Sequence, residues 1–332
     1  MPGAGTRLSW SAILGIALLL LGSAILLDAL WSPAFRFERT AVPVTETLAR
    51  SLKGVFPIEK LTRYTLRHGG DIAVELTVAD YRDARGTARR VTLFPDRAGD
   101  GLEGPGPGTA RQLRHDLWQA TAEAITKHTD ERALILSWWD NAQRVRFLTG
   151  RDTWLDRPAA AAFPDGNERA FWGEVAGGFA SGGEPEQWAR WLTMEADAAI
   201  AEMKSRLPQD RPVYLLVCLD DLARSAEIEA LSGVRLPFEA AVFPADGDVH
   251  GQIAQVKRWA REKGDFGYLV QQIPGVGIRA WRITTKQGQE MLLARLLPFN
   301  TSLARPLPRL PVVYQTGWGS YLTIYALHPG NG

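Results

Sequence analysis

The hydrophobic pattern of the chain begins with one long apolar run, residues 8–27, in which no side chain is charged. As a helix this run would be about 30 Å long, which is the thickness of the hydrocarbon core of a bilayer. It exceeds the apolar part of an ordinary cleaved signal peptide, and no clean small-x-small cleavage site follows it. We therefore expect residues 1–34 to form a retained signal anchor that crosses the lipid bilayer once, through residues 8–27.

The charges that flank this run orient it only weakly, because Arg7 precedes it while Arg36 and Arg39 follow it. The arrangement is that of a short N-terminal signal anchor, which leaves the N-terminus in the cytoplasm and carries the rest of the chain across the membrane. The remaining residues contain no comparable apolar run and are expected to form an extramembrane body.

Short stretches of period-two alternation follow the anchor, at residues 61–66 and 72–78, with turn residues between them. This pattern predicts a β-hairpin. A string rich in glycine and proline at residues 99–108 can neither continue a helix nor pair as a central strand. We expect a small β-containing region at residues 35–98 that ends at this string.

Helices and strands alternate beyond the glycine-rich string. Apolar residues at helical spacing predict helices at 109–128, 184–207 and 222–231, and short apolar runs predict buried strands at 133–137 and 213–219. Strands that alternate with helices are typical of layered structures with some parallel pairing. The fold class expected for residues 109–300 is therefore mixed α/β (α+β).

The C-terminal part has a different pattern. We expect a helix at 249–263, followed by an antiparallel meander of strands at 267–272, 277–285 and 290–297. An extended, proline-interrupted connection is expected at 298–311 and a last strand at 320–327. Residues 301–332 are thus expected to form an extended C-terminal segment with a final strand.

Composition excludes several functional classes. The 38 basic residues nearly balance the 37 acidic ones, so the chain has no general field that would attract nucleic acid. The single cysteine, Cys218, lies in an apolar run and is expected to be a buried core thiol. There is no Cys-x-x-Cys-His haem motif and no local histidine pair, so we expect no metal and no cofactor.

The least ordinary stretch follows the strand predicted at 133–137. Its candidate ligand or partner contacts are Trp138, Trp139, Asp140, Asn141 and Arg144. Two indoles beside a carboxylate and a helix N-terminus can bind a polar ligand. Equally, Asp140 or Asn141 can cap the helix while the indoles pack in the core. The residues alone leave both readings open.

A second pair of carboxylates, Asp220 and Asp221, follows the strand predicted at 213–219. Ligands often bind at this end of parallel strands. Capping of the next helix explains the pair more simply.

The Trp138-Trp139-Asp140 stretch resembles the Trp-Trp-Asp-Tyr-Gly signature in the soluble domain of oligosaccharyltransferase catalytic subunits. The likeness covers about residues 130–230. Asn141 and Ala142 stand where that family has Tyr and Gly, and the chain lacks the many membrane spans that carry the catalytic residues of the family. The resemblance implies a related soluble fold and argues against glycosyl transfer.

A second resemblance covers far more of the chain. One N-terminal span, a length of 332 residues, the absence of a haem motif and the block from Ser137 to Gly150 together resemble the hydroxylamine oxidation protein HaoB family. The resemblance implies a non-enzymatic accessory subunit of nitrification, anchored in the inner membrane with its body in the periplasm. Its implied partner is the multihaem hydroxylamine oxidoreductase. The alternative is a ligand-binding or transferase-like domain with a pocket around Trp138, Trp139 and Asp140.

Overall fold

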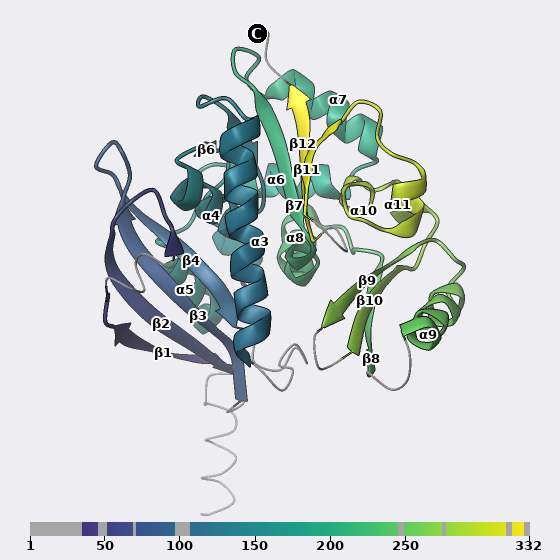
Figure 1. Cartoon of the computed structure of the whole chain (residues 1–332), viewed down its shortest axis with the longest axis horizontal. Coiled ribbons are helices and arrows are strands. Elements are labelled where there is room, and N and C mark those ends of the chain that lie inside the picture. The colour runs from purple at the N-terminus through teal and green to yellow at the C-terminus, as the bar shows by residue number, and fades with distance from the viewer. Residues whose placement is uncertain are drawn as a thin grey trace, which may run out of the picture.

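The computed structural model describes residues 35–45, 52–68, 71–96, 107–244, 249–273, 277–316 and 321–328. Three sheets lie within them: a four-stranded sheet near the N-terminus, a five-stranded central sheet and a three-stranded sheet (Figure 1). The predicted membrane span at residues 8–27 lies outside the described residues. Among the residues that are described, no helix is both long enough and apolar enough to cross a membrane.

The N-terminal sheet consists of β1 (Phe35–Val42), β2 (Ile58–His68), β3 (Asp71–Arg82) and β4 (Ala88–Asp96), in that order and antiparallel throughout. The predicted hairpin is β2 and β3. Phe37 of β1 and Tyr64 of β2 contact Phe171 edge-on, which attaches this sheet to helix α5 (Gly166–Ala176).

The central sheet has the order β11-β12-β7-β5-β6. Its strands β5 (Leu134–Leu136), β6 (Asp152–Thr153) and β7 (Val213–Cys218) are parallel. Strand β12 (Leu322–His328) pairs antiparallel with β7, and the edge strand β11 (Val312–Gln315) pairs antiparallel with β12. The predicted strands at 133–137 and 213–219 and the predicted last strand are confirmed. Helix α3 (Pro107–His128) matches the prediction at 109–128 and lies between the N-terminal and central sheets (Figure 1).

The chain from Glu184 to Arg206 forms two helices instead of the single predicted one. Helix α6 (Glu184–Thr193) ends where Met194 adopts an extended conformation, and α7 (Ala196–Arg206) begins after Glu195. At this break the Met194 carbonyl accepts a hydrogen bond from the Leu292 N–H, and Glu195 caps α7 with its own carboxylate. A tertiary backbone contact therefore overrides continuous helical periodicity.

The helix predicted at 222–231 begins three residues later than expected. A 3-10 turn covers Leu219–Arg224, and helix α8 spans Ser225–Ser232 with Arg224 at its N-cap. Asp221 does not cap this helix. Its side chain accepts a hydrogen bond from the backbone N–H of Cys218 instead, which holds the turn tightly against the end of β7.

The predicted meander is partly wrong. Strands β9 (Tyr268–Ile273) and β10 (Gly277–Ile283) are present, but their third partner is β8 (Phe238–Pro244), in the order β8-β10-β9. The third predicted strand, at 290–297, is replaced by helix α10 (Leu292–Leu296), which follows the 3-10 turn Gln287–Glu290. Its leucines 292, 293 and 296 are fully buried, a spacing that a helix satisfies as well as a strand does.

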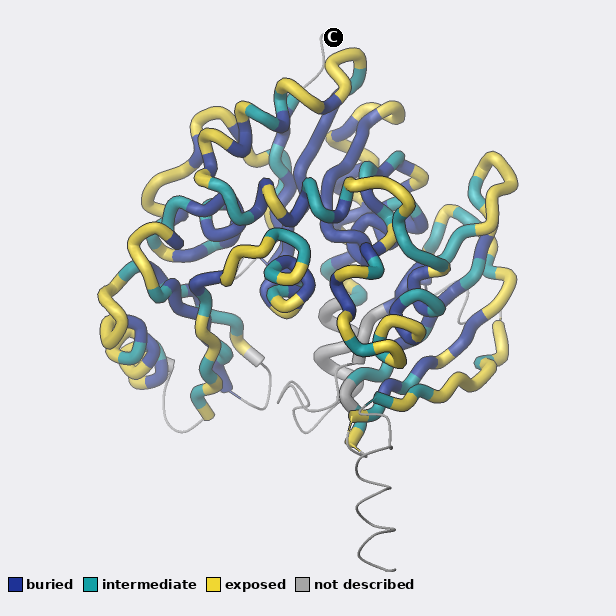
Figure 2. The backbone as a smooth tube through the Cα atoms, turned by 180° about the vertical axis from the view of Figure 1, so that it is seen from behind, coloured by how far each residue is buried: buried dark blue, intermediate teal, exposed yellow. Residues whose placement is uncertain are grey.

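Helix α9 (Val249–Arg261) agrees with the prediction at 249–263, and Val256 packs with Ile278 and Ala280 on one face of the three-stranded sheet. A short helix, α11 (Asn300–Ala304), interrupts the connection that was expected to be extended. The mixed α/β prediction is thus confirmed, with antiparallel sheets beside a partly parallel one. Buried residues concentrate along the central strands and exposed ones on the outer loops (Figure 2).

Candidate functional site

The Trp-Trp-Asp corner lies where two neighbouring parallel strands end. Strand β5 ends at Leu136, and helix α4 (Trp139–Thr149) begins three residues later. Its neighbour β7 ends at Cys218 and leads into the turn before α8. Because carboxyl ends of parallel strands meet at one edge of a sheet, residues after β5 and after β7 face each other there.

All five residues singled out from the sequence are buried. Their exposed fractions are 1% for Trp138, 0% for Trp139, 4% for Asp140, 1% for Asn141 and 3% for Arg144. Each of these side chains binds protein groups, as the following contacts show. We name the set formed by these five residues with Cys218, Asp221, Arg224 and Glu227 the buried ionic cluster.

Asp140 lies between two arginines. One of its carboxylate oxygens is 2.9 Å from Nη2 of Arg224 and 3.4 Å from Nη2 of Arg144. Burial alone would raise the pKa of Asp140, but the positive charges of Arg224 and Arg144 lower it to about 2. Asp140 is therefore a carboxylate across the physiological pH range.

Of the two alternatives that the sequence left open, capping of α4 by Asp140 or Asn141 is not what the structure shows. The N-cap of α4 is Trp138, which makes no side-chain capping bond, and Asp140 is already inside the first helical turn. The Asp140 carboxylate still accepts a bond from the Asn141 N–H. Its other oxygen points to the arginines, because two buried cations attract it more strongly than a further backbone donor.

Arg224 connects Asp140 to Glu227. Its Nη1 lies 2.8 Å from one oxygen of Glu227, and the other oxygen accepts hydrogen bonds from the indole N–H groups of Trp138, at 3.1 Å, and Trp139, at 3.0 Å. The guanidinium also lies over two rings, 5.3 Å from that of Trp139 and 4.9 Å from that of Trp172. Both indole donors and the cation are thus satisfied without solvent.

Arg144 and Asn141 extend the cluster to the N-terminal sheet and to β7. Arg144 donates to the side-chain oxygen of Asn141 at 2.7 Å and, through Nε, to the carbonyl of Thr92 in β4 at 3.0 Å. The amide of Asn141 donates to Asp221 at 2.8 Å and lies 3.3 Å from Sγ of Cys218. One helix turn therefore joins two sheets through buried polar groups.

Two acids on the β7 side are held in their neutral form. Burial raises the pKa of Asp221 to about 8, and the negative charge of Asp140 acts in the same direction, against the hydrogen bond from the Cys218 N–H. Burial also raises the pKa of the Cys218 thiol, which agrees with the predicted buried core thiol. With Asp221 protonated, Arg144 and Arg224 are balanced by Asp140 and Glu227.

The arrangement is chemically that of a closed cross-link between β5-α4 and β7-α8. That these five residues contact a ligand or a partner stays a prediction. Among the described residues, no group of three or more His, Cys, Asp or Glu side chains could hold a metal ion. Sequence reasoning missed Arg224 and Glu227. They are three residues apart on a predicted helix that follows a predicted strand, and this spacing could have identified them as an ion pair.

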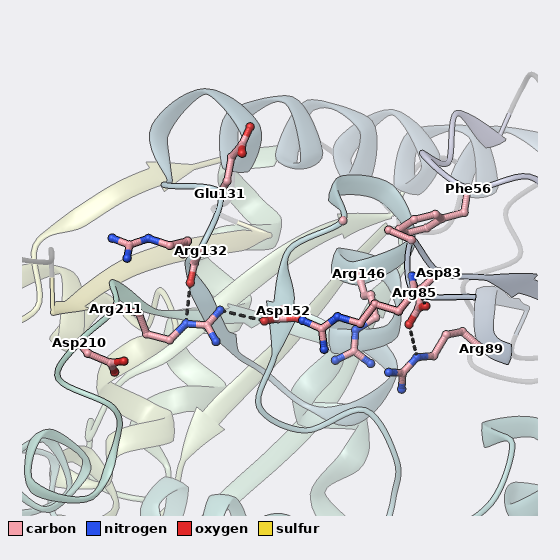
Figure 3. A pocket seen from close by; sticks show the side chains of 12 residues that line it. Phe56, Asp83, Arg85, Arg89, Glu131, Arg132, Arg146, Asp152, Asp210 and Arg211 are labelled. Atoms are coloured by element: carbon pink, nitrogen blue, oxygen red, sulfur yellow. Dashed lines mark hydrogen bonds and ion pairs between the residues drawn. The ribbon is translucent and has the colours of Figure 1, made fainter. Parts of the chain in front are cut away.

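Sequence analysis did not anticipate two cavities that share lining residues. The larger one opens at the opposite end of the central sheet, and the smaller one lies between β3, β4, α4 and the loop after β6. Their volumes are about 470 Å³ and 210 Å³, and Arg89 and Arg146 line both. The β3-β4 turn, the end of α4 and the loops before β5 and β7 surround the larger one (Figure 3). Arg89 binds Asp83 at 2.9 Å and Asp156 at 3.0 Å, and Arg146 also binds Asp156.

Comparison with known proteins gives weak structural likenesses and one family. The crystal structure of the C-terminal domain of PglB from C. jejuni is similar to 63% of this chain and 98% of that domain, with a TM-score of 0.36 and 12% sequence identity. No curated protein matches the chain. The model of the family described as HaoA-associated protein HaoB matches residues 6–327. This match confirms the resemblance seen in the sequence, and the chain belongs to the HaoB family.

Proposed function

We propose that this protein is an accessory subunit that binds HaoA, the hydroxylamine oxidoreductase of nitrification, and holds it at the membrane. The observation on which the proposal rests is the family match over residues 6–327, since the family is described as HaoA-associated. The uncharged run at residues 8–27 supports a single membrane anchor. In this proposal the N-terminus is cytoplasmic and the body lies in the periplasm, beside its multihaem partner.

The buried ionic cluster supports a structural rather than a catalytic part for this chain in that assembly. Asp140 and Arg224 bind each other and are 4% exposed, so neither faces solvent where a substrate would arrive. The alternative of a ligand-binding domain with its pocket at Trp138, Trp139 and Asp140 would require this cluster to open. Opening would leave buried charges unpaired, which costs several kcal/mol.

Co-purification tests the proposal directly. The full-length protein, tagged at its C-terminus, is produced together with HaoA, and the membranes are solubilised and passed over the affinity resin. Haem staining of the eluate should show HaoA in stoichiometric amount. A tagged but unrelated single-span protein is the control, and absence of haem protein from the eluate would refute the association.

Membrane attachment is tested separately by deleting residues 1–31. The truncated protein should leave the membrane fraction, because no other run of the sequence is as long and apolar as residues 8–27. HaoA should leave the membrane fraction as well, because the truncated chain lacks both the anchor and the signal that would carry its body to the periplasm. A truncated protein that stays with the membranes while folded and monodisperse would show a second attachment and contradict the single anchor.

A further inference from the structure

Seven arginines line the two adjoining cavities, which we name the arginine groove. They come from the turn after β3, from β4, from α4 and from the loops that precede β5 and β7 and follow β6. The arginines are Arg85, Arg89, Arg90, Arg132, Arg146, Arg157 and Arg211. Arginine is frequent at binding hot spots, and its planar fork matches a carboxylate in bidentate geometry.

Four of these arginines are held in place by carboxylates of the same chain. Arg89 and Arg146 share Asp156, Arg90 binds Asp80 at 2.6 Å, and Arg211 binds Asp152 at 3.1 Å. The backbone contributes as well, since Arg211 also donates to the carbonyl of Arg132 at 2.6 Å. These bonds fix the walls of the groove before anything enters it.

The other three arginines are exposed, and their guanidinium groups can still bind an anion. Among the described residues, the side chains of Arg85 and Arg157 make no ion pair and no hydrogen bond, and both are exposed. Arg132 is 74% exposed, and its nearest carboxylate is that of the neighbouring Asp130, at 3.6 Å. An incoming anion therefore need not displace an internal partner from Arg85 or Arg157, and at Arg132 it competes only with an exposed ion pair.

Acidic side chains line the groove too, and their positions divide it into two ends. Six acids line the two cavities, and four of them, Asp80, Asp83, Asp152 and Asp156, bind lining arginines. Glu131 and Asp210 lie at the end beside Arg132 and Arg211, whereas Arg85, Arg89 and Arg146 gather at the other end (Figure 3). A compact, highly charged anion would meet both signs of charge at once. An extended chain can place its carboxylates against the arginines and leave neutral groups beside Glu131 and Asp210.

We propose that the arginine groove is the docking site for an acidic, extended segment of the partner protein. The inference rests on the proposed association with HaoA and names the face of this chain that makes it. Charge complementarity supplies the recognition, with the exposed arginines at positions 85, 132 and 157 as its adjustable contacts.

The test uses the full-length protein in nanodiscs and a fluorescein-labelled deca-glutamate peptide, read by fluorescence anisotropy. The wild type should bind this peptide and should not bind deca-glutamine. Arg85→Glu and Arg157→Glu should each weaken binding by roughly ten-fold, since a like charge replaces an attractive one. Arg258→Glu is the matched control, because Arg258 is an exposed arginine of α9, far from the groove. It should change the affinity by less than about two-fold.

Two further variants are expected to raise the affinity for deca-glutamate instead of lowering it. Glu131→Gln and Asp210→Asn remove negative charge from the groove and should strengthen deca-glutamate binding, whereas a groove made for basic segments would lose affinity. All these positions are at the protein surface, and circular dichroism should confirm that each variant is folded. Inorganic phosphate, titrated alone, should bind no more tightly to the wild type than to Arg85→Glu.

The same variants in the HaoA co-purification separate this inference from the proposed function. Loss of HaoA with Arg85→Glu and Arg157→Glu, but not with Arg258→Glu, supports both. Equal recovery of HaoA with every variant overturns the groove as docking site and leaves the association intact. Groove-dependent binding of deca-glutamate without any recovery of HaoA refutes the association and keeps the acidic-segment site. No binding of deca-glutamate, or equal loss with Arg258→Glu, overturns the inference.

Discussion

The two ends of the central sheet use the same residue types in opposite ways. At the carboxyl ends of β5 and β7, Arg144 and Arg224 are buried and fully paired with acids. At the amino ends, Arg85 and Arg132 are exposed and line an open cavity. In α/β sheets the carboxyl ends are the usual place for a ligand. Here the buried ionic cluster fills the carboxyl ends, and the proposed docking site for a partner opens at the amino ends.

The strongest test of this contrast removes the central cation of the buried ionic cluster. Arg224→Ala leaves Asp140 and Glu227 buried without their shared partner, so we expect the free energy of unfolding to fall by about 3–5 kcal/mol. Urea denaturation measures this value. Arg258→Ala, on the surface of α9, should change it by less than about 0.5 kcal/mol. A loss below about 1 kcal/mol for Arg224→Ala would mean that the cluster does not hold the strand ends together.

Asp140→Asn tests the charge itself. A helix cap would tolerate this change, since Asn caps as well as Asp. We expect instead a loss of about 2–4 kcal/mol at neutral pH, because two buried arginines lose their common carboxylate.

The pH dependence of that loss gives an internal control. The pKa of Asp140 is about 2 in the folded protein against 3.8 in an unfolded chain, so its contribution is present above pH 4 and disappears as the pH falls toward 2. Wild type and Asp140→Asn should therefore converge in stability in acid. Parallel curves down to pH 2 would contradict the assigned ion pairs.

Asp221 should produce the opposite pH dependence. Its pKa is raised from 3.8 to about 8 on folding, so the folded state keeps a proton that the unfolded chain releases. Its contribution is complete below pH 4 and is lost as the pH rises to 8, with a slope of about 1.4 kcal/mol per pH unit. Asp221→Asn should flatten this decline, whatever its effect on absolute stability. An unchanged slope in denaturation curves across this range would assign the proton to another group.

The smallest effects are expected in the arginine groove. Arg85→Ala and Arg132→Ala should each leave the free energy of unfolding within about 0.5 kcal/mol of the wild type, because exposed charges contribute little to stability. Thermal melts of the two variants measure this. A loss as large as that of Arg224→Ala would show that the groove is also structural and would remove the contrast between the two ends.

Local pattern was enough to predict most elements of this fold. The apolar runs around Ile135 and Leu216 predicted buried strands, and the alternation at 61–66 and 72–78 predicted a hairpin. Residues 290–297 were misread because a short apolar run suits a helix and a strand equally. Only the packing of α10 against the core decides between them.

The site was harder to predict than the fold. Trp138, Asp140 and Asp221 attracted attention because each stands at the end of a predicted strand. The pairing of Asp140 with Arg224, of Trp138 with Glu227 and of Asp221 with Asn141 joins residues 84, 89 and 80 positions apart. These pairs depend on which strands become neighbours, and periodicity carries no information about them. The arginine groove was missed for the same reason, since its side chains are scattered along the chain and converge only when the N-terminal sheet packs beside the central one.

Glu227 accepts hydrogen bonds from two indoles that precede it by 89 and 88 residues. Contacts so distant along the chain form only after a long loop has closed, whereas the helices form from local contacts. We expect the buried ionic cluster to assemble after the rate-limiting step of folding, so that Arg224→Ala should accelerate unfolding and leave the folding rate unchanged in stopped-flow measurements; slower folding of the variant would contradict this. Interactions made that late slow unfolding without accelerating folding. On this expectation the lifetime of the folded protein, more than the speed of its formation, depends on one carboxylate shared by two tryptophans.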